Sequence, residues 1–489
     1  MPNSYILSFD QSTQSTKAFL LNGEGTIVAS ASLSHRQIYD QNGNLFHDLN
    51  EIYSNFIQIA KEVIKKSKID SGSIQGIAIA NQRETSCLFS AQGLPLAQAI
   101  VWKNTISQPI VTKMAIYQEE IRSKTGLPLS PFYPASKYAW LINSKKENKD
   151  LLNAGQAHLG TIDSYLICRL TKGKVFKTDV TNGSRTSLMD LKTLGYDEKI
   201  CSYFGLKSSY LPQIDFSDGD FGMTDLEGAL NHEVPIISVM GDSHAAFYGH
   251  DCFKVGQGKA TYGTGSSIMV NVGSAPLFSS SGLNSSIGFG EKGKVCYVLE
   301  GNINCTGGVI TWLKDKLHLI KEPEDAEKMA LKAAPDSNVY LVPAFNGLNA
   351  PYNNSSASAL LIGLKENTGP AEICKAGLDS IAYQIQDVIA SIEKDLGKKI
   401  SSLSVDGGPT SNRYLMQMQA DLSSLSILVP KDKEMTGKGV GLMALKKLGL
   451  LHVDKENSSF EEYVPKMDNK SREDKLVGWS KAVRAAQVN

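Results

Sequence analysis

The sequence has few cysteines, no excess of either charge and no long apolar run, and each of these features argues against a class of protein. Its 489 residues include seven cysteines, at positions 87, 168, 201, 252, 296, 305 and 374, with no Cys-x-x-Cys pair. An odd, scattered set argues against a disulfide framework or a zinc site and favours a reducing compartment. The 50 Lys and Arg residues balance 50 Asp and Glu, which gives no support for a nucleic-acid or membrane-surface partner.

Other absences point the same way. No apolar run approaches the roughly 20 residues that cross a membrane, and the N-terminal segment becomes polar too early for a signal peptide. The sequence lacks G-x-x-x-x-G-K-[ST], a G-x-G-x-x-G after the first apolar run, and His-Glu-x-x-His. These gaps argue against a P-loop, a dinucleotide domain and a zinc protease site. We therefore expect a cytoplasmic protein whose substrate is a small soluble molecule.

The length is too great for one ordinary core, so two large domains are expected. We place the boundary near Asp251, which gives domains 1–251 and 252–489. Helix-like and strand-like segments alternate: residues 51–67 have helical spacing, and "SIQGIAIANQRETSCLFS" follows as an apolar strand. This rhythm is typical of the α/β class. No low-complexity linker marks the boundary.

The first segment, "YILSFDQSTQSTKAFLLNGEGTIVASASL", predicts strands joined by tight turns. Asp10 ends the first apolar run and is followed by hydroxyl and amide residues. An acidic group beside such donors suits a metal-bound phosphate. A hairpin turn with solvated polar residues is the simpler reading, and these residues alone do not decide between the two.

The second half contains a loosely similar unit. "KATYGTGSSIMVNVG" (259–273) predicts a strand, a Gly/Ser/Thr turn and a second strand. Residues 369–397 show the clearest helical stripe, and "KKISSLSVDGGPTSNRYLMQMQADL" then predicts a strand, a Gly-Gly turn and a helix with Asn412 in its first turn. Two such hairpins are what a duplicated fold would contain.

The stretch "SVMGDSHAAFYGHD" places Asp242, Ser243 and His244 at a strand-to-helix turn. Two readings are open. Ser243 is the nucleophile of a GDS-type esterase, with a partner from the Asp-x-x-His spacing of Asp315 and His318. Alternatively, Asp242 is a carboxylate base and no nucleophilic serine exists.

Five segments in order resemble the FGGY family of carbohydrate kinases: "FDQSTQSTKA", "IANQRETS…AIVWKN", "GTIDSYLICRLTKGKVFKTDVTNGSRTSL", "GDSHAAFYG…YGTGSS" and "VPAFNGLNAPY…VDGGPTSN". Each motif is weak alone, and together they span residues 5 to about 450. The resemblance implies an α/β fold of two actin/hexokinase-like (ribonuclease H-like) domains around a central cleft. It also implies ATP and Mg2+ as cofactors, a small polyol or sugar as substrate, and a homodimer or homotetramer.

The resemblance carries residue roles with it. Asp242 matches the general base, and Asp10 with Asp242 matches the magnesium site. The matches to the polyol pocket are Arg83, Glu84, Trp102, Phe132, Asp242, Ser243 and Ser267. The matches to the ATP site are Thr13, Gln14, Lys17, Thr264, Gly265, Gly307, Gly408 and Asn412. Without this resemblance, a solvated strand end would be the preferred reading of Arg83 and Glu84.

Departures from the family pattern bear on the substrate. Phe132 stands at a tyrosine position, Ser243 at a glutamine position and Ser267 at an aromatic position. Glycerol is the first substrate expected, and a longer polyol or a ketose (erythritol, xylulose or ribulose type) is the alternative, because such swaps change the hydrogen bonds that select a substrate. Ser12, Gln14 and Lys17 depart from family Gly, Thr and Arg positions. These changes keep a non-catalytic nucleotide sensor open as a further alternative.

Overall fold

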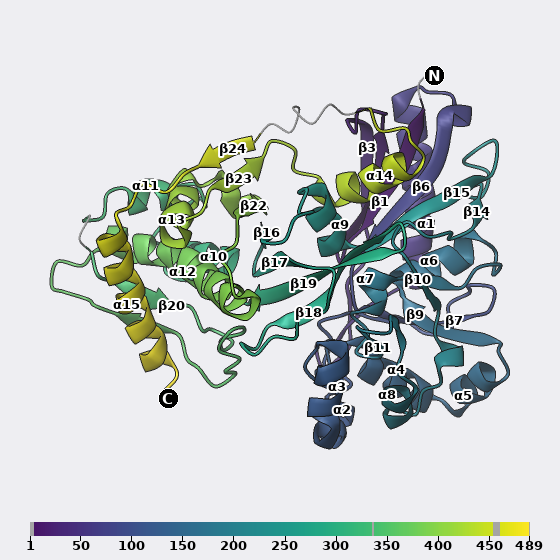
Figure 1. Cartoon of the computed structure of the whole chain (residues 1–489), viewed down its shortest axis with the longest axis horizontal. Helices are drawn as coiled ribbons and strands as arrows, with labels where there is room; N and C mark the ends of the chain where they lie inside the picture. Colours follow the sequence, from purple (N-terminus) through teal and green to yellow (C-terminus); the bar gives the residue numbers. More distant parts are fainter. Residues whose placement is uncertain (1–3, 335–336, 453–459, 489) are drawn as a thin grey trace.

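The computed structural model describes residues 4–334, 337–452 and 460–488, and its two large sheets lie one after the other along the long axis (Figure 1). The first sheet has six strands in the order β14 (Met223–Thr224), β15 (Val234–Gly241), β6 (Ile74–Asn81), β1 (Tyr5–Gln11), β2 (Ser15–Leu21) and β3 (Ile27–Ser34). The strands β1, β2 and β3 pair antiparallel, β6 and β15 add parallel to β1, and β14 closes the edge antiparallel.

The second sheet repeats this topology. Its order is β18 (Asn284–Glu291), β19 (Lys294–Ile303), β17 (Ser266–Gly273), β16 (Gln257–Tyr262), β22 (Ser402–Asp406), β23 (Ile427–Pro430) and β24 (Phe460–Tyr463). Again three strands, β16, β17 and β19, are antiparallel, two parallel strands follow, and the last is antiparallel. The strand β18 is an addition beyond β19. The expected α/β class and the duplicated arrangement are therefore confirmed.

Smaller sheets and the helices complete the chain. A five-stranded sheet runs β4 (Ile38–Tyr39), β5 (Leu45–His47), β8 (Ala99–Ile100), β7 (Ser86–Ser90) and β9 (Ala157–Thr161). Three strand pairs are β10 (Lys177–Asp179) with β13 (Gln213–Asp215), β11 (Met189–Asp190) with β12 (Gly195–Tyr196), and β20 (Tyr340–Val342) with β21 (Leu360–Ile362). The helices are α1 (Leu49–Ser67), α2 (Gln108–Met114), α3 (Gln118–Thr125), α4 (Pro134–Ser144), α5 (Lys146–Asn153), α6 (Ile162–Leu170), α7 (Val180–Gly183), α8 (Glu198–Tyr203), α9 (Asp242–Gly249), α10 (Gly307–Asp315), α11 (Asp325–Ala330), α12 (Pro370–Leu396), α13 (Arg413–Ser423), α14 (Met435–Lys447) and α15 (Asn469–Ala486). Four short 3-10 turns are η1 (Ser71–Ser73), η2 (Ala115–Tyr117), η3 (Ser208–Tyr210) and η4 (Gly408–Ser411).

Local sequence signals account for the two longest helices. At the start of α1, the Asp48 side chain accepts a hydrogen bond from the Asn50 amide, as an N-cap does, and the helix buries one apolar face on β2 and β3. The helix α12 begins with Pro370 in its first turn and ends at Gly397, which has φ +71°. The expected stripe of α12 lies in the core of the second half. Both helices confirm the sequence-based expectation.

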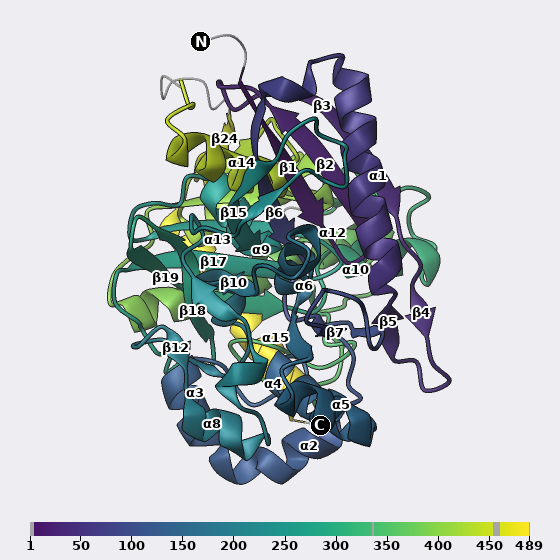
Figure 2. The ribbon, with the colours of Figure 1, turned by 90° about the vertical axis from the view of Figure 1, so that its right-hand side faces the viewer.

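Late in the sequence, the chain returns to the first half. The helix α14 packs on α9 and against β1 and β6, and Figure 1 shows it, in yellow-green, beside the purple strands. Figure 2 shows α1 along the neighbouring strands β2 and β3. The expected boundary near Asp251 stays a prediction, and α14 is a segment of 252–489 that lies on the first sheet. No helix among the described residues combines the length and the apolar character of a membrane span.

The α9–α14 crossing depends on two glycines. A Cβ added at Gly439 would lie 1.8 Å from the Ala245 carbonyl oxygen, and one at Gly249 would lie 2.6 Å from the Met435 carbonyl oxygen. Both obstacles are backbone atoms, so no side-chain rotation relieves them. Because α9 begins with Asp242, this contact also fixes the position of that carboxylate.

We expect Gly439→Ala to lower the free energy of unfolding by about 1–3 kcal/mol, because the methyl group overpacks two helices that cannot separate without disturbing the sheet. Urea denaturation followed by circular dichroism measures the change. Gly195→Ala is the matched control, since its added Cβ meets only the Thr193 hydroxyl at 4.0 Å. Equal stability of the two variants would contradict the close crossing.

Candidate functional site

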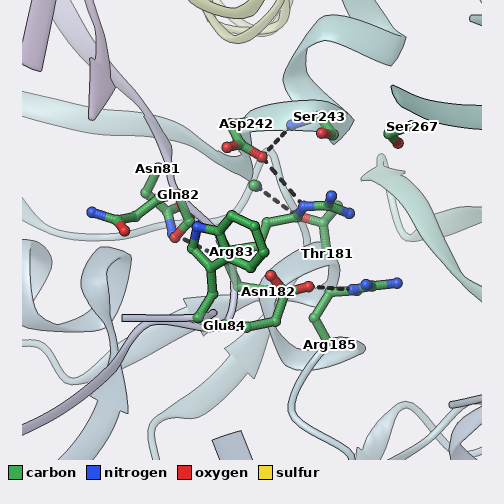
Figure 3. Close-up of polar contacts among 12 residues, drawn as sticks. Asn81, Gln82, Arg83, Glu84, Thr181, Asn182, Arg185, Asp242, Ser243 and Ser267 are labelled. Atoms are coloured by element: carbon green, nitrogen blue, oxygen red, sulfur yellow. Dashed lines mark hydrogen bonds and ion pairs between the residues drawn. The ribbon is translucent and has the colours of Figure 1, made fainter. Parts of the chain in front are cut away.

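Asp242 is the first residue of α9, directly after the buried strand β15. Its Oδ1 lies 3.2 Å from Arg83 Nε and accepts a 2.6 Å hydrogen bond from the Ser243 amide (Figure 3). Burial raises the pKa of Asp242, while Arg83 and the Ser243 amide oppose that rise. The side chain keeps a third of its surface exposed. It is therefore held in place and still open to a ligand.

Arg83 belongs to a buried network of ion pairs. Glu300, on β19 of the second sheet, is fully buried and accepts from Arg83 Nη2 at 3.1 Å and Arg185 Nη1 at 2.7 Å. Arg185 in turn donates through Nε to Glu84 at 2.7 Å. In Figure 3 the Arg83 and Arg185 side chains extend in the same direction. The network thus joins the two halves beneath the predicted pocket.

A solvated strand end, the reading of Arg83 and Glu84 that sets the family resemblance aside, is wrong. Both are largely buried rather than at a solvated strand end. They do not pair with each other: Glu84 has φ +61° and faces Arg185, and Arg83 faces Asp242 and Glu300. Burial alone would raise the pKa of Glu300, but Arg185 and Arg83 hold it well below its usual value. Glu300 therefore stays ionised and keeps both arginines in fixed positions.

Glu300 and Arg185 were not among the predicted site residues. Arg185 lies in the segment "NGSRTSL", which carried the family resemblance without a role for this residue. The signal for Glu300 was a lone acidic residue within the apolar strand "VCYVLEGNI". A charge at such a position is expected only with a buried partner.

Two aromatic side chains form the next wall. Trp102 is 37% exposed and Phe132 is 44% exposed, and their ring centroids lie 6.1 Å apart. The Trp102 indole donates to the Thr13 hydroxyl at 3.0 Å. The neighbouring Tyr133 is buried, with its ring centroid 5.3 Å from Cζ of the Arg185 guanidinium.

A buried lysine holds the aromatic wall from behind. Lys137 Nζ donates to the backbone carbonyls of Trp102 (2.8 Å) and Phe132 (2.5 Å). Burial lowers the pKa of Lys137 to about 7. This residue, also absent from the predicted set, fixes both aromatic residues through their backbone.

The two serines at the pocket differ in their contacts. Ser267, on β17, donates to Glu300 Oε1 at 2.8 Å. The Ser243 backbone amide serves Asp242, and within the described residues no hydrogen bond joins the Ser243 hydroxyl to a histidine. Asp315 and His318 are exposed at and beyond the end of α10. The structure brings no esterase triad together at Ser243.

The turn of residues 12–14 between β1 and β2, named the first turn, holds Thr13 and Gln14. Lys17, beyond it on β2, forms an ion pair with Glu434 at 2.8 Å, just before α14. Asp10 faces Lys17 across the strand pair. Burial and the nearby Asp242 carboxylate raise the pKa of Asp10 to about 7, and its Oδ1 is buried without a hydrogen-bond partner among the described residues.

The turn of residues 263–265 in the second half, named the second turn, holds Thr264 and Gly265. Its Gly263 and Thr264 carbonyls accept from the amides of Thr306, Gly307 and Gly308, so the turn packs on the start of α10. A Cβ added at Gly307 would lie 2.7 Å from the Gly263 oxygen and 3.5 Å from Pro409. The second turn, α10 and η4 therefore meet.

At η4, the space beside Gly408 is empty, whereas the side chain of Asn412 is used to cap the next helix. A Cβ added at Gly408 would meet no atom within 4 Å. Asn412 lies just before α13, where its side-chain oxygen accepts from the Leu415 amide at 2.9 Å. Only its amide NH2 is left for a ligand.

We expect Glu300→Gln to lower the free energy of unfolding by about 3–5 kcal/mol, because it leaves two buried guanidinium groups short of their counter-charge. Thermal and urea unfolding measure this loss. Glu62→Gln is the control, since Glu62 forms an exposed pair with Lys66 and such pairs contribute at most about 1 kcal/mol. A change at Glu300 as small as that at Glu62 would show that the network does not support the fold.

Comparisons with known protein families match both halves of the chain. Residues 5–249 match the N-terminal domain, and residues 258–448 the C-terminal domain, of the FGGY family of carbohydrate kinases. Glycerol kinase 1 of Thermotoga maritima is 40% identical over 98% of this chain and 99% of its own length. Glycerol kinase of Chromobacterium violaceum is 38% identical over 100% of this chain and 99% of its own.

Among solved structures, Plasmodium falciparum glycerol kinase with ADP has a TM-score of 0.91 at 36% identity, and covers 100% of this chain and 99% of its own. A ligand-bound xylulose kinase from Lactobacillus acidophilus, with a TM-score of 0.86 at 23% identity, covers 99% of this chain and 97% of its own and shares the fold. The structure has the two-domain actin/hexokinase-like fold of these kinases. The chain belongs to the FGGY family of carbohydrate kinases.

Proposed function

We propose that this protein transfers the γ-phosphoryl group of ATP to a terminal hydroxyl of glycerol, with Asp242 as the general base. The proposal rests mainly on the contacts and the partial exposure of Asp242. It is oriented by Arg83 at 3.2 Å, partly exposed, and close enough to Asp10 to raise the pKa of that residue. The full-length similarity to glycerol kinases supports glycerol as the acceptor.

Asp242 suits proton abstraction. Burial raises the pKa of Asp242 from the ordinary value of an aspartate, and a raised pKa makes a carboxylate a stronger proton acceptor. Arg83 opposes this rise and fixes Oδ1, so the other oxygen is free for the substrate hydroxyl. Phosphoryl transfer needs little more from the protein than such positioning and charge neutralisation.

Asp10, with Asp242, is proposed to hold Mg2+. The unpartnered, buried Oδ1 of Asp10 and the raised pKa of this residue fit a cation that would supply the missing positive charge. When bound, magnesium neutralises phosphate oxygens. Lys17 adds a second positive charge beside Asp10 and is paired with Glu434.

The remaining roles are those that the family resemblance implies. Arg83, Glu84, Trp102, Phe132, Ser243 and Ser267 are proposed to line the polyol pocket. Thr13, Gln14, Thr264 and Gly265 are proposed to hold the phosphates, and Gly307, Gly408 and Asn412 the adenosine. We also propose a cytoplasmic enzyme of two domains divided near Asp251, which assembles as a homodimer or homotetramer.

A longer polyol or a ketose is the second candidate substrate. Phe132 offers no hydroxyl, and the Ser267 hydroxyl is occupied by Glu300. Ser243 and Ser267 are also smaller than the glutamine and the aromatic residue of the family pattern. This side of the proposed pocket therefore offers fewer hydrogen bonds and more room than the family pattern does. Such a pocket would also admit a substrate that reaches beyond three carbons.

Asp242→Asn is expected to reduce turnover about 10²–10⁴-fold, the contribution of a positioned base, while ATP binding measured by calorimetry changes little. Asp325→Asn, at a partly exposed aspartate of α11 that pairs with Lys328, is the control. Full turnover in Asp242→Asn would remove the role assigned to this residue.

A panel of acceptors separates the two substrate candidates. With magnesium and ATP, ADP release is measured on glycerol, erythritol, xylitol, D-xylulose, L-xylulose, D-ribulose and gluconate. We expect kcat/KM to be highest on glycerol. A larger value on a four- or five-carbon acceptor would assign the Phe132, Ser243 and Ser267 side of the pocket to that substrate instead.

A further inference from the structure

The first turn is held by side chains that the proposed function does not use. Ser12 O accepts from the side-chain amides of Gln11 at 2.8 Å and Gln82 at 3.3 Å. Thr13 O accepts from Gln37 Nε2 at 2.9 Å. Gln14 O accepts from the His35 backbone amide at 3.1 Å. All three carbonyls of the first turn therefore accept a hydrogen bond.

His47, at the end of β5, connects two of these glutamines. Its Nδ1 lies 3.3 Å from Gln82 Nε2, and its Nε2 lies 3.3 Å from Gln37 Oε1. Gln82 Nε2 also contacts Gln11 Oε1 and Ser12 O, so it must be a donor. Nδ1 of His47 is then an acceptor, and its Nε2 carries the proton. Only the neutral ring with this tautomer serves both neighbours.

The surroundings keep this ring neutral. His47 is fully buried, with the His35 ring 4.6 Å away edge to face. Burial, followed by His35 and Lys103, lowers the pKa of His47 to about 3. Burial also lowers the pKa of His35, with Thr13 O and Glu51 acting against it. No carboxylate is hydrogen-bonded to the His47 ring among the described residues.

Holding the carbonyls leaves the amides of the turn free. Neither the Thr13 nor the Gln14 N–H donates a hydrogen bond to any residue that the structure describes. Two adjacent free amides beside Lys17 are donors suited to phosphate oxygens. The Thr13 hydroxyl also accepts from Trp102, which links the turn to the aromatic wall.

We propose that His47 is a positioning residue for the triphosphate: as a neutral imidazole it aligns Gln37 and Gln82, which hold the Thr13 and Ser12 carbonyls and so present the Thr13 and Gln14 amides to the phosphates. The inference rests on the proposed kinase function. According to this inference, the buried His47 affects the affinity for the phosphates and not the binding of adenosine or of the polyol.

The test compares two ligands by calorimetry: the magnesium complex of a non-hydrolysable ATP analogue, and adenosine. His47→Phe keeps the ring and removes both nitrogens. It is expected to weaken the triphosphate about tenfold, as the loss of one hydrogen bond does, and to leave adenosine unchanged. In turnover, KM for ATP rises by a similar factor, while KM for glycerol changes less than about twofold.

Controls keep the outcomes separate. Gln37→Leu removes the donor to Thr13 O and should act in the same direction, so the test stands even where His47→Phe folds poorly. His158→Phe removes an imidazole that stacks on Phe176 and lies edge-on to Phe89, and should change neither ligand.

Equal weakening of both ligands, or of neither, overturns the proposal. Wild-type protein that binds the analogue and phosphorylates no polyol refutes the proposed function alone, because binding is read without turnover. Wild-type protein that binds no nucleotide refutes both.

Discussion

A single buried carboxylate, Glu300, sets the relation between the two halves of the molecule. Taking an ion out of water costs several kcal/mol, and the cost is offset only where the partners are well placed. Arg83, Arg185 and Ser267 meet that need from three different segments. Because Arg83 is held by Glu300, its Nε presents a fixed donor to Asp242. The position of the proposed base in the first half is therefore determined by a charge in the second.

The helix α9 is fixed to the second half at its other end as well. His250 follows it, buried, with its ring nitrogens 2.6 Å from Ser404 Oγ and 2.9 Å from Asp406 Oδ2. Asp406 ends β22, directly before the glycine pair of the proposed adenosine site. One short helix thus carries the base at its first residue and meets the nucleotide loop beyond its last. A displacement of that loop must act on α9, and through α9 on Asp242.

Local patterns in the sequence predicted the elements well, because each depends on a period or a turn signal within a few residues. The meander at the start, the helix α12 and the strand-to-helix turn at Asp242 are confirmed. The ion pairs could not be predicted in this way, because their partners are far apart in the sequence. Glu300 lies 217 residues from Arg83, and Glu434 lies 417 residues from Lys17. The resemblance assigned residue types to the proposed pocket. It did not show that the adjacent Arg83 and Glu84 face different partners, which the positive φ of Glu84 decides.

One local and one long-range contact explain why the altered first turn does not imply a lost function. Where the family pattern has glycine, Ser12 has no positive φ, and its hydroxyl closes the turn by donating to Ser15 O and accepting from the Ser15 amide. Lys17 keeps the positive charge of the family arginine and is oriented by both oxygens of Glu434. Two of the three departures are thus accommodated: Ser12 closes the turn, and Lys17 is a cation held in a fixed position. A binding module without chemistry has no use for such contacts beside the unpartnered oxygen of Asp10, and this favours a working phosphotransferase over a nucleotide sensor.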